Sequence, residues 1–152
     1  MLQIGDAGLS PIEARSHFGA WAVVAAPLLI AADIVSGLDP DSLEVLSAPE
    51  VIAVDQDPLG VQGVRVSPHQ PQGTECWARP LYDGGIALLL LNRAPLATAN
   101  VFCDFAQAGV LKPGEGVKVR DLWARADLGM FEGNFTAVNV PPHGSMLVKL
   151  TQ

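Results

Sequence analysis

The chain has 152 residues, of which 49% are hydrophobic and 16% charged, a composition that supports a packed core and excludes wholesale disorder. The net charge of −7 argues against nucleic acid or an anionic membrane as the main partner, because both select for basic surfaces. No apolar run approaches the roughly 20 residues that a membrane-spanning helix needs. Residues 1–11 lack the basic and apolar regions of a signal peptide, so the compartment stays open.

The charge is unevenly distributed along the chain. Residues 1–60 contain nine acidic residues and one basic residue, a sum of −8, whereas residues 61–152 contain seven acidic and eight basic residues, a sum of +1. The turn-forming sequence Asp57-Pro58-Leu59-Gly60 lies at the junction. We therefore predict two domains, over residues 1–58 and 59–152.

The first domain is predicted to alternate helix, strand and helix. Ser10-Pro11-Ile12-Glu13 has the form of a capping box with proline at the first helical position, which predicts a helix that ends before Pro27. The apolar run 28–32 is typical of a buried parallel strand, and Asp39-Pro40 predicts a second helix. Residues 50–54 fit a strand or a helix equally well.

This order of elements is typical of an α/β layer or barrel, but it leaves the strand at residues 28–32 without a partner. Nothing else in residues 1–60 offers a convincing parallel strand. We expect either that this edge pairs with a second copy of the chain or that further residues precede Met1.

The second domain is predicted to be an antiparallel β-sandwich, so the fold class is α/β followed by all-β. Six short strand-like segments alternate with turns rich in Asn, Gly and Pro, which is typical of a sandwich. These segments are residues 76–81, 86–91, 97–105, 117–123, 130–140 and 146–150.

Several longer motifs are spread over nearly the whole chain, namely Met1-Leu2-Gln3-Ile4-Gly5-Asp6-Ala7-Gly8-Leu9-Ser10, Arg15-Ser16-His17-Phe18, Ala26-Pro27-Leu28-Leu29-Ile30, Glu50-Val51-Ile52-Ala53-Val54-Asp55-Gln56-Asp57-Pro58-Leu59-Gly60-Val61-Gln62-Gly63, Arg120-Asp121-Leu122-Trp123-Ala124 and Val140-Pro141-Pro142-His143-Gly144. Together these motifs resemble the α-galactosidases (melibiases) of glycoside hydrolase family 27. The resemblance implies the last units of a (β/α)₈ barrel followed by a C-terminal β-domain. It implies an enzyme that hydrolyses terminal α-linked galactose with retention, without metal or cofactor.

The resemblance also implies that the catalytic residues lie elsewhere. Retaining glycosidases use two carboxyl groups roughly 5 Å apart, and both family aspartates belong to motifs upstream of Met1, so we assign no catalytic residue to this chain and expect it to be inactive alone. Met1 matches a family residue that lines the sugar pocket and is the predicted substrate-binding residue. Asp6-Ala7 replaces a usual Asn-Gly, so the loop that follows could differ from the family's.

The acidic residues that are present have simpler interpretations. Asp33 follows the predicted strand, where barrel enzymes place functional groups, but a role in capping a loop is the favoured reading. Asp55 and Asp57 could form a carboxylate pair, and we favour a structural role in forming the turn and joining the domains.

The remaining conspicuous side chains are also read as structural. His17, His69 and His143 have no Cys or acid at metal-ligand spacing, so no metal site is predicted. Trp21, Trp77 and Trp123 could stack on sugars, but core packing is favoured because each lies in an apolar pattern. Cys76 and Cys103 are expected to be buried free thiols, with a disulfide between strands as the alternative.

Three alternatives stay open. An α-N-acetylgalactosaminidase or a β-L-arabinopyranosidase would differ in pocket loops upstream of this sequence. A stand-alone, non-catalytic β-sandwich that binds sugar or protein would show an open aromatic platform. A fragment without independent function would expose the apolar edge of residues 28–32.

Overall fold

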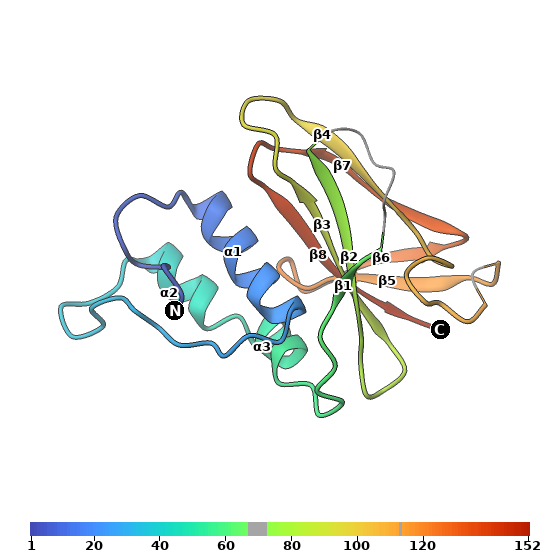
Figure 1. The fold of residues 1–152 in the computed structure, drawn as a ribbon, viewed down its shortest axis with the longest axis horizontal. Coiled ribbons are helices and arrows are strands. Elements are labelled where there is room, and N and C mark those ends of the chain that lie inside the picture. Colours follow the sequence, from blue (N-terminus) through green and yellow to red (C-terminus); the bar gives the residue numbers. More distant parts are fainter. Residues whose placement is uncertain (67–72, 113) are drawn as a thin grey trace.

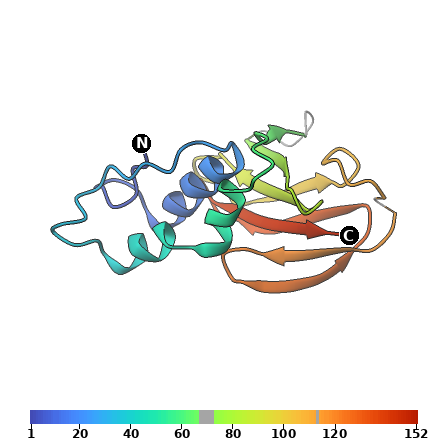
Figure 2. The ribbon, with the colours of Figure 1, turned by 90° about the horizontal axis from the view of Figure 1, so that it is seen from below.

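The structure is a computed structural model that describes residues 1–66, 73–112 and 114–152. Three helices precede eight strands in the described part of the chain, and Figures 1 and 2 show the helices gathered on one side of the sheets. The helices are α1 (Pro11–Val23), α2 (Pro40–Leu46) and α3 (Pro49–Asp55). The strands are β1 (Val64–Arg65), β2 (Thr74–Pro80), β3 (Ile86–Asn92), β4 (Ala99–Asp104), β5 (Val117–Asp121), β6 (Ala126–Phe131), β7 (Asn134–Val140) and β8 (Ser145–Thr151).

The predicted helix starts are confirmed. Ser10 caps α1 in a complete capping box, in which its hydroxyl accepts from the Glu13 N–H and the Glu13 carboxylate accepts from the Ser10 N–H. Asp39 caps α2 by accepting from the Ser42 N–H. Residues 50–54, left open by the sequence, belong to α3, which begins at Pro49.

The apolar run 28–32 differs from the predicted buried strand. It makes one parallel bridge, Leu2 to Ile30, in which the Leu2 N–H donates to the Leu29 carbonyl at 2.7 Å and the Ala31 N–H donates to the Leu2 carbonyl at 3.2 Å. Leu2 is thus a parallel partner that the sequence analysis did not find. The Leu29 side chain is 58% exposed, because within the described residues nothing covers the outer side of this pair.

The antiparallel β-sandwich is confirmed. One sheet has the strand order β1-β2-β3-β8-β5-β6, the other pairs β4 with β7, and every pairing between these strands is antiparallel in the described part of the chain. The segment predicted at residues 130–140 contains β7 and only the end of β6, since the chain turns at Gly133 with φ +71°, and the start of β6 at Ala126 was not predicted. The short strand β1 was also not predicted.

The strand β3, inside the six-stranded sheet, is buried on both faces, which explains its continuous apolar sequence. Leu88 and Leu90 point into the core between the two sheets, whereas Ala87 and Leu89 contribute to a second core shared with the helices. Phe18 of α1 is 1% exposed in that second core. This core draws on residues of both predicted domains.

The expectation of free thiols is wrong. Cys76 of β2 and Cys103 of β4 form a disulfide that links the two sheets, with a Cα–Cα distance of 5.7 Å. Both residues are completely buried and face the core between the sheets. Local sequence gives no register between strands of different sheets, which is why the two thiols could not be paired in advance.

Candidate functional site

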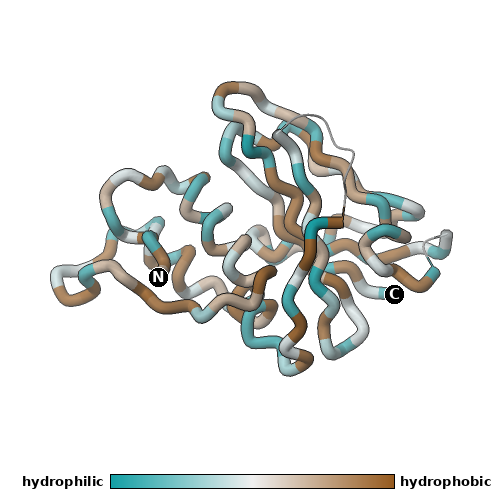
Figure 3. Tube along the Cα trace, viewed as in Figure 1, coloured by the Kyte–Doolittle hydropathy of each residue, from teal (hydrophilic) through white to brown (hydrophobic). Residues whose placement is uncertain are grey.

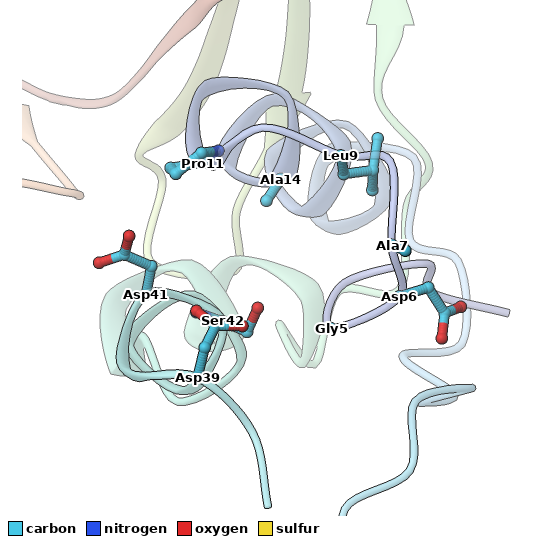
Figure 4. A pocket seen from close by; sticks show the side chains of 9 residues that line it. All are labelled: Gly5, Asp6, Ala7, Leu9, Pro11, Ala14, Asp39, Asp41 and Ser42. Atoms are coloured by element: carbon cyan, nitrogen blue, oxygen red, sulfur yellow. The ribbon is translucent and has the colours of Figure 1, made fainter.

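The loops that precede α1 and α2 enclose the first candidate site, a cavity of about 410 Å³ (Figure 4). Gly5, Asp6 and Ala7 line one wall, and Asp39, Asp41 and Ser42 of the α2 start line another. In Figure 4 the carboxylates of Asp6 and Asp41 lie on opposite sides of the cavity. The departure Asp6-Ala7, noted from the sequence, therefore lies in its lining.

The loop between the apolar run and α2 is held by Asp33. Its carboxylate accepts from the N–H groups of Val35 and Ser36 and, at 2.6 Å, from the Ser36 hydroxyl. The hydroxyl of Ser36 and these N–H groups lower the pKa of Asp33. Asp33 thus has the loop-capping role that the sequence analysis favoured, and it does not line the cavity of Figure 4.

Asp55 and Asp57 have separate structural surroundings. Asp57 accepts from the Leu59 N–H at 3.0 Å and from the Tyr82 N–H at 3.0 Å, so it forms the turn after α3 and joins it to the β2–β3 hairpin. The favoured domain-joining role of Asp57 is confirmed. Burial raises the pKa of Asp55, whose Oδ1 is buried without a hydrogen-bond partner among the described residues, and Gln56 donates to Oδ2 at 2.5 Å.

The histidines that the structure describes form structural hydrogen bonds. The Nε2 atom of His17 accepts from the Gln3 N–H at 3.2 Å, and burial lowers the pKa of this imidazole. The Nδ1 atom of His143 lies 2.9 Å from Glu13 Oε1 and so joins the β7–β8 turn to the capping box of α1. His69 lies outside the described residues. Within the described ranges, no group of three or more His, Cys, Asp or Glu side chains could hold a metal ion.

Met1 lies next to the paired strand ends. Its side chain is 68% exposed, and the backbone of the adjacent Leu2 is fixed by the bridge to Ile30. Its predicted contact with a sugar stays a prediction.

In the part of the chain that the structure describes, no helix is long and apolar enough to cross a membrane.

Arg79 of β2 joins the helices to the sandwich, and the sequence analysis missed it. The side chain is completely buried, and its Nη1–H donates to the Ala22 carbonyl at 2.6 Å while Nη2–H donates to the Asp55 carbonyl at 3.2 Å. Both carbonyls belong to helix C-termini, where a positive charge interacts favourably with the helix dipole. A charged residue within the otherwise apolar predicted segment 76–81 was the signal available in the sequence.

An ion pair also joins these two parts of the molecule. The Arg120 guanidinium of β5 binds both carboxylate oxygens of Glu50 of α3, at 2.7 and 2.8 Å. These hydrogen bonds lower the pKa of Glu50. The pair borders a cavity of about 310 Å³ between α3 and the sandwich, which Lys149 also lines.

The three tryptophans pack partly buried against the core shared by helices and sandwich, as favoured from the sequence. Trp123 lies 6.3 Å from the Phe18 ring and 5.7 Å from the Arg15 guanidinium. Trp21 and Trp77 also line an open groove between α1 and the sheet.

Asp33, Asp55, Asp57 and Glu50 each serve a loop or an interface. The chain matches two family models. Residues 71–150 match the α-galactosidase C-terminal β-sandwich domain, and residues 1–57 match the model described as α-galactosidase A. The chain belongs to the α-galactosidases of glycoside hydrolase family 27.

Individual relatives agree with this assignment. An α-galactosidase of Coffea arabica is 40% identical over 151 residues, which cover 99% of this chain and 38% of the relative. The crystal structure of α-galactosidase I from Mortierella vinacea superposes with a TM-score of 0.90 at 27% identity and covers 100% of this chain and 38% of that enzyme. A family 27 β-L-arabinopyranosidase from Geobacillus stearothermophilus shares the fold. The superposition covers 95% of this chain and 31% of that enzyme, with a TM-score of 0.82 at 24% identity.

These matches decide among the earlier alternatives. The chain spans between 35% and 39% of the length of the α-galactosidases it resembles in Dictyostelium discoideum, Cyamopsis tetragonoloba, Arabidopsis thaliana and Coffea arabica. A stand-alone sandwich is not favoured, because the similarity includes the helical residues 1–57 as well as residues 71–150.

Proposed function

We propose that this chain forms the C-terminal part of a retaining α-galactosidase. In the complete enzyme, residues 1–58 would close the wall of the catalytic barrel and residues 59–152 would form the β-sandwich that supports it. The observation that carries the proposal is the unbroken similarity to α-galactosidases across both regions.

The two carboxyl groups that retention requires would come from the rest of the barrel, with one as nucleophile and the other as acid and then base. This chain would contribute the loop face at the carboxyl ends of the strands, where barrel enzymes place their active sites. The cavity of Figure 4 opens between two such loops and supports this placement.

The isolated chain should not hydrolyse galactosides. Purified chain is incubated with an aryl α-galactoside, and turnover is compared with that of a chimera in which the preceding portion of the Coffea arabica enzyme is joined to residues 1–152. Activity in the chimera alone would support the proposal. Turnover by the isolated chain that disappears in Asp33→Asn would overturn it.

We further propose that Met1 contacts the bound sugar, because it matches the pocket-lining residue of the family and its side chain is exposed beside a fixed strand end. In the chimera, Met1→Ala should raise KM by about 5- to 20-fold through lost apolar contact, which corresponds to about 1–2 kcal/mol. Met130→Ala on β6, which is 64% exposed, is the matched control and should leave KM unchanged.

A further inference from the structure

An open apolar groove runs between α1 and the six-stranded sheet. It has a volume of about 350 Å³, and its walls include Trp21 of α1 and Trp77, Leu89 and Leu91 of β2 and β3. We call it the indole groove. Glu75 and Arg93 form its polar rim.

The indole groove continues an interface that is already formed. Gly19 of α1 lies so close to the sheet that an added Cβ would meet Leu89 at 3.3 Å. Leu89 is 2% exposed and belongs to the core that α1 and α3 share with the sheet. The same strand thus passes from a covered region under α1 directly into the open groove.

The order of the helices identifies what covers the remainder. The parallel bridge between Leu2 and Ile30 makes α1 the connection between two neighbouring strands. In such a wall each helix lies between the helices of the preceding and the following unit. The helices of the following unit, α2 and α3, pack against α1, and α3 is joined to β5 by the Glu50–Arg120 pair. The flank on the opposite side, above β2 and β3, is the indole groove.

We propose that the indole groove receives an amphipathic helix, the one that precedes the strand of Leu2 in the complete α-galactosidase barrel. This inference rests on the proposed function. Apolar side chains of that helix at positions i and i+3 or i+4 would pack against Trp21 and Trp77. The sandwich would then be covered by this preceding helix together with α1 and α3.

The rim predicts the polar partner of this helix. Glu75 is 7% exposed at its side chain and binds Arg93 at 2.9 Å and Arg65 at 3.5 Å, so two guanidinium groups share one carboxylate. Trp77 Nε1–H also donates to Glu75, at 2.9 Å. Two arginines that share one carboxylate leave one surplus positive charge. The Arg93 side chain, which is 64% exposed, presents this charge to an acidic side chain on the incoming helix.

The test compares the isolated chain with the Coffea arabica chimera by hydroxyl-radical footprinting and mass spectrometry. Oxidation of Trp77 should be at least fivefold slower in the chimera, while the exposed Met130 keeps its rate in both and serves as the internal reference. An equal Trp77 rate in an active chimera would overturn the groove proposal and leave the proposed function standing. Protection of Trp77 in an inactive chimera would support the groove proposal and overturn the proposed function. An inactive chimera in which Trp77 is not protected would overturn both proposals.

A pair of matched variants gives a second readout. Leu91→Gln should lower the Tm of the chimera by about 3–6 °C more than that of the isolated chain, because the side chain is only partly buried in the isolated chain and would be fully covered in the chimera. Val138→Gln on β7, a residue 67% exposed on the other sheet, should change neither. Equal effects of Leu91→Gln in the two proteins would contradict the proposal.

Discussion

At the residue scale, Arg79 is the side chain on which the attachment of the helices most depends. It brings a buried cation to the C-terminal carbonyls of α1 and α3, namely those of Ala22 and Asp55. Arg79→Met should lower the free energy of unfolding by about 2–4 kcal/mol, because one buried and one part-buried carbonyl each lose a hydrogen bond from the guanidinium. Urea denaturation measures the change. Arg65→Met, which removes a half-exposed arginine, is the control and should cost under about 1 kcal/mol.

Glu13 makes the stability of the same interface depend on pH. The Ser10 backbone N–H, then its hydroxyl, then His143 lower the pKa of Glu13 from 4.5 to about 2. A lowered pKa in the folded state contributes stability that is present above pH 4.5 and is lost as the pH falls toward 2. Glu13→Gln should therefore reduce the loss of urea stability between pH 5 and pH 3. The exposed Glu132→Gln should keep the wild-type profile, and a Glu13→Gln protein that does so as well would contradict this account.

At the element scale, the sequence predicted what is set locally. The capping box of Ser10 and Glu13 and the proline at position 11 fix the start of α1 through neighbouring atoms. The predictions failed where the deciding contact is distant. Leu2 is 28 positions from Ile30, and Cys76 faces Cys103 only after the two sheets have packed.

The candidate site was predictable to the same extent. Loop capping by Asp33 follows from its own loop, whereas the buried contacts of Arg79 depend on helices more than 20 residues away along the chain. The sugar contact of Met1 and the assignment of no catalytic residue rest on the resemblance to α-galactosidases and stay predictions. No local pattern could have located the indole groove, since it exists only between packed elements.

The disulfide is the element-scale feature with the largest expected effect on stability. It closes a loop with a sequence separation of 27 residues between β2 and β4. Loss of that cross-link should lower the free energy of unfolding by about 3–4 kcal/mol in the chain-entropy description. The double variant Cys76→Ala, Cys103→Ala and wild type in dithiothreitol should show similar urea midpoints. A reducing agent that lowers the midpoint of the double variant as well would show that its effect does not come from this bond.

At the scale of the whole molecule, the helical region has two apolar surfaces with opposite roles. One is the core shared with the sandwich, which includes Val51 and Leu147, both completely buried. The other is the loop before α2, where Figure 3 shows hydrophobic residues along the outer edge and where Ile34 is 61% and Val35 94% exposed. An exposed surface of this kind favours self-association.

These two surfaces predict opposite results for two changes. Ile34→Lys with Val35→Lys should shift the chain toward monomer in sedimentation-velocity runs at several concentrations, because it replaces exposed apolar surface with charge. Removal of residues 1–58 should instead increase association, because it uncovers Leu89, Leu122 and Leu147 on the sheet. A shortened chain more soluble than the whole one would contradict this account, because it would show that the helical region promotes association and does not shield the sheet. Thr136→Lys with Val138→Lys, on the far sheet, controls for added charge alone.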